Sequence, residues 1–233
     1  MSPEEIEARI LHRDGMMLII DKPPGVPVHR GPKGGENLED YFDALRFGLP
    51  RPPALAHRLD KDTSGCLVLG RHRKALERLG QLFKRGEVDK IYWAVVQGGP
   101  PADEGFIDMP LGRLDATRGW WMKPDANGLP AQTRWRVLGR APGLAFLALE
   151  PLTGRTHQLR VHCASSGFPI LGDPVYGARE NYTNPAAPPL HLHAREIVVP
   201  MARNGPPTKV RAPAPAHMRD ALMQCGWDGN ETR

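Results

Sequence analysis

The chain has 233 residues, a formal net charge of +5 and a sequence pI near 9.3. This length can hold a sizeable core, as one large domain or as two packed halves, and the positive charge favours an anionic partner. Three cysteines without a close pair argue against a disulfide framework, an acidic N-terminus argues against a signal peptide, and no apolar stretch is long enough to span a membrane. We therefore expect a protein of the reducing cytoplasm.

Apolar periodicity and turn residues predict a loop-rich α+β fold. The first strand is expected at residues 16–20, followed by a turn at 23–25 and a short helix at 38–46. A strand at 66–69, buried on both faces, leads into a helix that ends at Gly86. The later elements are hairpins within 100–143, a strand at 144–149, a helix from Thr156 to about Gly167, a strand at 197–199, an extended Pro-rich stretch at 206–215 and a helix near 218–225.

Residues 87–97 alternate in the manner of a strand. The odd-numbered side chains from Ile91 to Val95 face one side, and the even-numbered side chains from Tyr92 to Val96 face the other. A tyrosine in a strand usually belongs to the core, so Tyr92 has this structural interpretation beside any functional one.

Positive charge is concentrated in residues 51–90, where the basic residues exceed the acidic ones by five. The helix predicted there carries a polar stripe, because successive members are four, three and four residues apart. Such a stripe is either a solvated helix face or, beside a nucleic-acid site, a track for backbone phosphates. Its members are Lys74, Arg78, Gln81 and Arg85.

The stretch HRLDKDTSG, from His57 to Gly65, precedes the strand at 66–69 and is the most informative of the chain. Its last three residues favour a turn. Asp60 lies on a loop anchored by a rigid strand, and such loops often carry catalytic or binding residues. The same residues also fit, more simply, a surface loop whose two aspartates cap turns and pair with neighbouring basic side chains.

The HRLDKDTSG string resembles the central motif of the RluA-type RNA pseudouridine synthases, in which the aspartate is catalytic. Four further segments match that family in the same order, and together the five span about residues 14–200. Five motifs in register are far more specific than one. The four segments are DKPPGVPVH at 21–29, KIYWA at 90–94, LTGRTHQLRVH at 152–162 and GFPILGDPVYG at 167–177.

The resemblance implies the pseudouridine synthase fold, which is α+β with a mixed, mainly antiparallel sheet, flanking helices and a central RNA-binding cleft. It implies one catalytic domain over residues 1–233, in which 201–233 form a C-terminal extension with a short helix. Many relatives carry an S4-type RNA-binding domain in front of the catalytic domain. We expect none here, so that the catalytic domain alone would find the RNA.

The implied activity is isomerisation of a uridine in structured RNA, either tRNA or 23S rRNA, to pseudouridine. Asp60 is implied as the essential catalytic residue, acting either as a nucleophile or as a base. Tyr92 is implied to stack on the target uracil, Arg160 to lie beside Asp60 and keep it ionised, and Arg58 to fill the space of the flipped base. Because the reaction conserves oxidation level, we expect no cofactor and no metal. We also expect an RNA partner, no membrane, and a monomer without an obligate protein partner.

Further RNA contacts are expected from the polar residues of these motifs. Arg155 is interpreted as a phosphate ligand or a structural residue, and His157 and Gln158 as side chains that bridge loop backbone groups around the site. The full set of predicted RNA-contacting residues, in addition to Arg58, is His57, Lys74, Arg78, Arg85, Arg155, His157 and Gln158.

Two other classes of function stay open at this point. A non-catalytic RNA-binding protein of the same fold would be indicated by changes at Asp60, Tyr92 or Arg160, and all three are intact. A metal-dependent hydrolase would draw on the aspartates of the central loop and on histidines. The candidate ligands for zinc are poorly spaced for a shared site, since no Cys-x-x-Cys or His-x-x-x-His pair occurs. These candidates are His157, His162, Cys163, His191 and His193.

Overall fold

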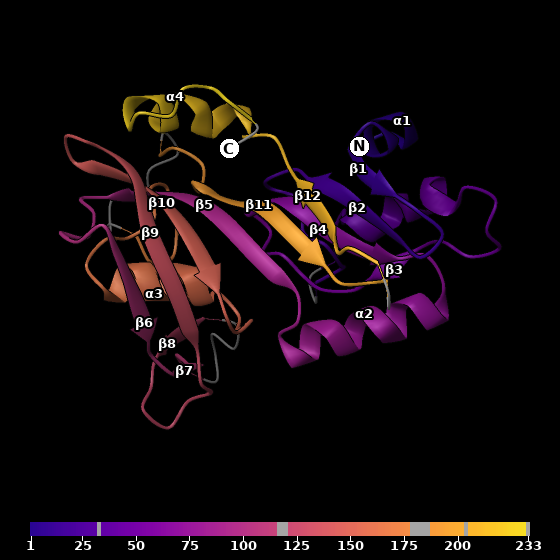
Figure 1. Cartoon of the computed structure of the whole chain (residues 1–233), viewed down its shortest axis with the longest axis horizontal. Helices are drawn as coiled ribbons and strands as arrows, with labels where there is room; N and C mark the ends of the chain where they lie inside the picture. Colours follow the sequence, from indigo (N-terminus) through magenta and orange to yellow (C-terminus); the bar gives the residue numbers. More distant parts are fainter. Residues whose placement is uncertain (32–33, 116–120, 178–186, 203–204, 232–233) are drawn as a thin grey trace. The chain divides into compact units, whose positions relative to one another are not determined.

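The computed structural model of the chain describes residues 1–31, 34–115, 121–177, 187–202 and 205–231 (Figure 1). Contacts between Cα atoms divide the chain into two units, each with its own strands and core. Unit 1 comprises Met1–Lys90 and Ala194–Pro213, and unit 2 comprises Ile91–His193 and Ala214–Arg233. Among the described residues, each helix is too short or too polar to cross a membrane.

The strands of unit 1 follow the order β1-β2-β4-β11, with β3 beside β4 and β12 beside β11. The pairs β1–β2, β2–β4, β3–β4 and β11–β12 are antiparallel. In the β2–β4 pair, Lys22 lies opposite Gly65, so the start of the 21–29 segment adjoins the end of the HRLDKDTSG stretch. The strand bounds are β1 Ile10–Arg13, β2 Met17–Lys22, β3 Ala54–Leu55, β4 Ser64–Gly70, β11 Leu192–Val199 and β12 Thr208–Arg211.

The helices of unit 1 are α1 (Pro3–Glu7), the 3₁₀ helix η1 (Leu38–Arg46) and α2 (Arg73–Arg85). Leucines recur along α2 at helical spacing, and the apolar side of this helix packs on β4 and its neighbours in one buried cluster. Gly86 ends α2 in the left-handed conformation, with φ of 71°, as a C-terminal glycine commonly does. Every residue of β4 is buried, which confirms the strand predicted to be covered on both faces.

In the described part of unit 2, four strands follow the order β5-β10-β9-β6, all paired antiparallel, beside a separate β7–β8 hairpin. The helix α3 (Gln158–Ser165) and the helix α4 (Ala216–Gln224) complete the unit (Figure 1). The strand bounds are β5 Asp89–Gln97, β6 Glu104–Asp108, β7 Leu111–Arg113, β8 Met122–Pro124, β9 Gln132–Ala141 and β10 Leu144–Pro151.

The alternation along β5 places α3 and α4 on opposite faces of this sheet. The odd-numbered side chains from Ile91 to Val95 pack with α4, and the even-numbered ones from Tyr92 to Val96 pack with α3. Both helices bury apolar side chains there, so each face of the sheet has its own core. The two faces predicted for residues 87–97 are confirmed.

The structure confirms the α+β class and the mainly antiparallel pairing, and it corrects several element bounds. Helix α1 and strands β1 and β12 were not predicted, and β11 is longer than the strand expected at 197–199. Helix α3 begins at Gln158 rather than Thr156, because His157 takes a left-handed backbone conformation with φ of 53°. Part of the predicted hairpin region, residues 116–120, lies outside the described residues. The central cleft and the single catalytic domain stay predictions.

Candidate active site

The loop that carries Asp60 forms a tight turn immediately before β4 in unit 1. The Thr63 N–H donates to the Asp60 carbonyl at 3.2 Å, which closes the turn over residues 60–63. Gly65 follows with φ of 105°, and a Cβ there would lie 2.3 Å from the Ala194 carbonyl oxygen. Only glycine fits that position, so the motif glycine lets the turn run directly into a buried strand.

Lys22 fixes the same turn from the neighbouring strand. Its side chain is fully buried, and Nζ donates to the carbonyl of Lys61 at 2.8 Å. Two more carbonyls, of Pro23 and Val26, accept at 2.7 and 2.8 Å, so the three N–H donors of an ammonium are all used. Burial lowers the pKa of Lys22 to about 7, and the charges of Asp62, Asp60 and Asp21 act in the opposite direction. The carbonyl of Lys61, the residue that follows Asp60, is therefore held by a fully buried lysine side chain.

His57 and Arg58 have different surroundings. The Val68 N–H donates to His57 Nε2 at 3.0 Å, and the His57 ring stacks on Phe83 with centroids 4.5 Å apart. Burial and the charge of Lys90 lower the pKa of His57 to about 3, so the ring is neutral and accepts at Nε2. His57 thus ties the loop to β4 and α2, while Arg58 is exposed. The predicted RNA contact of His57 stays a prediction beside this structural role.

The polar stripe of α2 lies largely on the outside of unit 1. Lys74 and Arg85 are exposed, and Arg78 is half-buried. The Arg85 guanidinium is 3.7 Å from the Glu87 carboxylate, an exposed pair that contributes little to stability. The stripe is available to a partner, and its role as a phosphate track stays a prediction.

Tyr92 is half-buried on β5, in unit 2. It lies opposite Leu149 of β10 and packs at the margin of the cluster that α3 covers. A half-buried tyrosine is compatible with both interpretations of Tyr92, the core residue and the residue that contacts a ligand. Stacking of Tyr92 on a uracil stays a prediction.

Gln158 and Arg155 hold the chain around the start of α3. The Gln158 side-chain oxygen accepts from Thr153 Oγ1 and the Arg155 N–H, and its nitrogen donates to the Gln132 carbonyl and Thr133 Oγ1. These four bonds use the whole hydrogen-bonding capacity of the side-chain amide. The predicted RNA contact of Gln158 stays a prediction. Bridging of loop groups by Gln158 is what the structure shows. Arg155 precedes the helix rather than lying on it, and its Nε donates to the Pro130 carbonyl at 2.9 Å.

Arg160 forms a buried ion pair that the sequence did not predict. Its Nε and Nη2 each lie 2.8 Å from one carboxylate oxygen of Asp173, a bidentate arrangement. Burial alone would raise the pKa of Asp173, but the Arg160 guanidinium and the amides of Tyr176 and Val175 bring it below its ordinary value. Asp173 belongs to the 167–177 segment of the family resemblance, which gave no role to this aspartate. The predicted position of Arg160 beside Asp60 stays a prediction.

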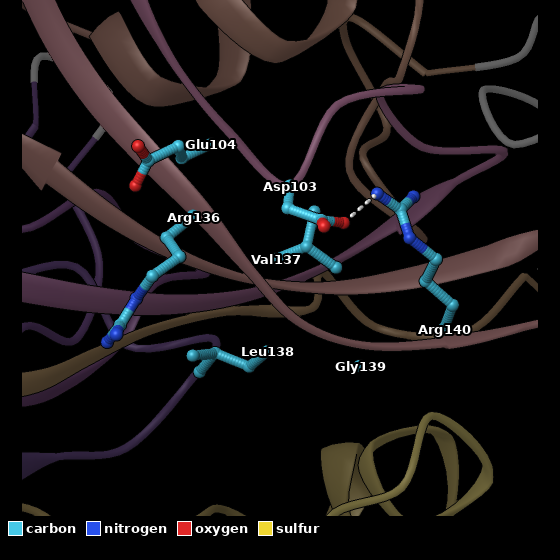
Figure 2. Close-up of a pocket in the computed structure, with 7 residues that line it drawn as sticks. All are labelled: Asp103, Glu104, Arg136, Val137, Leu138, Gly139 and Arg140. Atoms are coloured by element: carbon cyan, nitrogen blue, oxygen red, sulfur yellow. Dashed lines mark hydrogen bonds and ion pairs between the residues drawn. The ribbon is translucent and has the colours of Figure 1, made fainter.

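One hollow on the surface of unit 2 is lined by none of the predicted site residues. This shallow hollow is lined by residues at the start of β6 and along β9, where Arg140 Nη2 is 3.0 Å from Asp103 Oδ1 (Figure 2). Within the part of the chain that the structure describes, no three His, Cys, Asp or Glu side chains come together as a metal-binding group. The residues that line the hollow are Asp103, Glu104, Arg136, Val137, Leu138, Gly139 and Arg140.

Comparison with known proteins assigns the family. A family model described as RNA pseudouridylate synthase matches residues 16–165, which include Asp60, Tyr92 and Arg160. An uncharacterized RNA pseudouridine synthase of Zymomonas mobilis is 45% identical over 191 residues, which cover 81% of this chain and 87% of that protein. The ribosomal large subunit pseudouridine synthase C of Vibrio cholerae is 36% identical, over 94% of this chain and 70% of that protein.

A solved structure extends the similarity to the fold. The human RNA pseudouridylate synthase domain containing 4 superposes with a TM-score of 0.79 at 29% identity, over 96% of this chain and 95% of that chain. The family model covers more than half of the sequence, and the relatives cover most of it. The chain therefore belongs to the RNA pseudouridine synthase family, isomerases that convert uridine in RNA to pseudouridine.

Proposed function

We propose that Asp60 is the essential carboxylate of this pseudouridine synthase. The observation that carries the proposal is the construction of its turn, in which the Thr63 N–H holds the Asp60 carbonyl and Lys22 holds the next one. A reacting group must be held in place for efficient catalysis, and a turn fixed by buried bonds on a rigid strand provides this. Asp60 acts either as a nucleophile at C1′ or as a base that triggers elimination at the sugar.

The other residues take roles that follow from the chemistry. The enzyme breaks the N1–C1′ bond, turns the uracil and rejoins it through C5, so the base must leave its stack. We propose that Tyr92 stacks on the uracil and that Arg58 fills the space of the flipped base. We propose that Arg160 supplies positive charge beside Asp60, and the bidentate bonds to Asp173 hold its guanidinium in one orientation.

The substrate we propose is a uridine in structured RNA, in 23S rRNA or tRNA. The relative named ribosomal large subunit pseudouridine synthase C favours rRNA. The exposed members of the α2 stripe would contact phosphates, which supply affinity without reading sequence. We also propose that the chain acts as a monomer. Its three free and buried cysteines support our proposal that it works in a reducing compartment. Mapping pseudouridines in rRNA and tRNA of a deletion strain tests the target, and an unchanged map in both would overturn it.

Asp60→Asn is the direct test of the catalytic assignment. We expect it to abolish pseudouridine formation while RNA affinity stays near that of the wild type, because phosphate contacts supply most of the affinity. Asp62→Asn is the matched control, since it removes a carboxylate from the same turn and should stay active. Both are measured by tritium release from labelled uridine RNA and by RNA binding. Turnover of Asp60→Asn within about tenfold of the wild type would refute the assignment, because loss of a catalytic group costs more.

A further inference from the structure

Five arginines gather in unit 1 at the end of β4 that lies away from the Asp60 turn. They come from the end of β1, from the end of η1 with the stretch after it, and from the junction of β4 with α2. Met17 and Ala54 both lie opposite Gly70, the last residue of β4, so these segments meet there. The group, which we call the arginine surface, consists of Arg13, Arg46, Arg51, Arg71 and Arg73.

Arg71 ties these segments together through neutral groups. Its N–H donates to the Met16 carbonyl at 2.9 Å. Its guanidinium donates to the Asp14 carbonyl at 2.6 Å and to the Arg46 carbonyl at 3.4 Å. Because carbonyls carry no net charge, these bonds hold the Arg71 side chain without neutralising it. The arginine surface is therefore fixed in shape and stays positive where its segments meet.

Arg13 is held by an aromatic ring. Its Cζ lies 4.3 Å from the centroid of the Phe47 ring, a cation–π contact. This contact uses the flat face of the guanidinium and leaves the N–H donors, which lie in its plane, for another partner. Phe47 has φ of 44°, a left-handed conformation that is unusual for a bulky residue, and such outliers cluster at functional sites. A strained aromatic residue thus presents an exposed arginine.

Only part of this positive charge is neutralised. Arg46 pairs with Asp43 at 2.5 Å. Arg73 pairs with Glu77 at 2.8 Å, and both pairs are largely exposed and therefore weak. The Asp14 carboxylate accepts from two backbone amides of its own turn. For the other three arginines, the described part of the chain places no carboxylate within ion-pair distance, so the surface attracts an anionic partner. These three are Arg13, Arg51 and Arg71.

The chemistry of the arginine surface fits the phosphates of RNA. A merely solvated face is served equally well by lysine, but all five basic positions here are arginine, whose planar fork binds two phosphate oxygens at once. Strand β4 has seven residues, which at about 3.3 Å each place the surface about 20 Å from the Asp60 turn. A structured RNA that brings a uridine to Asp60 extends over such a distance, and its backbone carries charge along the whole way.

We propose that the arginine surface is a second RNA-binding surface of this enzyme, which binds backbone phosphates of the structured RNA at a distance from the target uridine. This proposal rests on the proposed function, in which Asp60 acts on a uridine in structured RNA. The surface adds affinity and orients the RNA but takes no part in the chemical step. Arg71 holds the segments in place, and the three most exposed arginines contact phosphate. These are Arg13, Arg51 and Arg73.

The triple variant Arg13→Gln/Arg51→Gln/Arg73→Gln tests the proposal, because these exposed side chains can be changed without disturbing the core. Binding is measured with a long RNA hairpin over a range of salt concentrations. We expect affinity to fall by about ten- to a hundredfold at physiological salt and the log–log slope to fall by about 2–3, since each lost phosphate contact is worth about 0.7–0.9. An unchanged slope would overturn the proposal.

Turnover separates binding from chemistry. Tritium release is followed with uracil-labelled RNA from a strain that lacks the enzyme. The glutamine triple variant should raise KM and leave the single-turnover rate at saturating enzyme nearly unchanged, because phosphate contacts far from the uridine position the RNA without acting on the bond. A saturating rate that falls as much as the affinity would overturn the proposal, since the arginines would then affect the chemical step.

Two matched variants show whether position and side-chain type matter. The lysine version of the same triple variant keeps the charge but not the fork, so it should keep the salt slope and lose only part of the affinity. Arg134→Gln/Arg136→Gln/Arg219→Gln removes the same charge from exposed positions of unit 2 and should bind the hairpin nearly as the wild type does. Equal losses in the two glutamine variants would overturn the proposal, because net charge alone would then explain them.

An acidic protein is the other partner that an arginine surface could bind, and competition tests it. Poly-glutamate that displaced the hairpin from the wild type as well as unlabelled hairpin of equal charge would overturn the assignment to RNA. The proposed function is tested separately, because hairpin binding needs no turnover. Activity retained by Asp60→Asn would refute the proposed function. Unchanged affinity of the glutamine triple variant, together with an inactive Asp60→Asn, would refute the arginine surface alone.

Discussion

Replacing Arg160 with methionine is expected to destabilise the fold as well as to impair catalysis. The Arg160 and Asp173 side chains are 4% and 0% exposed, and the two bonds between them are 2.8 Å long. Without the guanidinium, Asp173 would keep only the amides of Val175 and Tyr176 as partners for a buried negative charge. Removing one member of a buried pair costs about 3–5 kcal/mol. For a chain of this size, that loss lowers the melting temperature by about 6–20 °C.

The loss should depend on pH in a direction that the pair dictates. The wild-type pair lowers the pKa of Asp173, so it contributes stability above the ordinary Asp value of about 3.9 and loses it as pH falls through the folded value. In Arg160→Met, burial is no longer opposed by the cation, so the pKa of Asp173 rises. The variant then takes up a proton on folding at mildly acid pH. The difference in stability between wild type and variant should be full near neutral pH and shrink toward pH about 4.

Denaturant unfolding of both proteins over this pH range checks the prediction. Asp173→Asn is the companion variant, because an amide oxygen can still accept from the two backbone amides but carries no charge. The double variant Arg160→Met/Asp173→Asn should be more stable than Arg160→Met alone, and the cycle gives the interaction energy of the pair. Two results would show that the buried pair does not control stability. Arg160→Met would lose less than about 1 kcal/mol of unfolding free energy, as exposed pairs do, or it would lose the same amount at every pH.

Three further predictions concern binding, chemistry and stability. Tyr92→Phe should keep RNA binding but slow single turnover, and Tyr92→Ala should weaken both; wild-type behaviour of the two would make Tyr92 a core residue. Lys22→Met should lower the free energy of unfolding by about 1–3 kcal/mol through unpaired carbonyls, and an unchanged urea midpoint would count against it. Since the lowered pKa of Lys22 makes the unfolded chain bind more protons, wild-type stability should rise between pH about 7 and 10, and this rise should weaken in Lys22→Met. Replacing the basic α2 residues with glutamine should reduce the salt dependence of RNA binding by up to about 0.7–0.9 in log–log slope for each phosphate that is no longer bound, and an unchanged slope would make the stripe a solvated face. These residues are Lys74, Arg78 and Arg85.

The sequence predicts the regular parts of the fold because their periodicity is local. The alternation from Ile91 to Val96 defines two faces, and the leucines and terminal Gly86 of α2 define a helix and its end. Elements that depend on tertiary partners were missed. Strand β12, for example, is a short stretch within a Pro-rich tail that becomes a strand because β11 pairs with it.

The candidate site was predictable in its residue types and not in its contacts. Asp60 and Arg160 follow from motifs. Asp173, which binds Arg160 within unit 2, is thirteen residues further along the chain, and the irregular segment between them gives no spacing from which the contact could be predicted. The hydrogen bond between His157 and Tyr176 likewise joins residues nineteen apart, and the Met122 amide of β8 donates to the same hydroxyl. Hydrogen-bond networks of this kind are set by packing in three dimensions, and a spacing rule along the chain does not reveal them.

Lys22 shows how two motifs that look separate in the sequence form one piece of structure. The 21–29 segment and the HRLDKDTSG stretch are joined because β2 pairs with β4 and places Lys22 opposite Gly65. From there, the buried ammonium reaches the Lys61 carbonyl, thirty-nine residues away, and holds the peptide next to Asp60. Since a buried cation is costly unless its protons are all bonded, a lysine in this place must be matched by its three carbonyls. A substitution in the 21–29 segment that moves any of these carbonyls should therefore disturb the Asp60 turn as directly as a substitution within the turn itself.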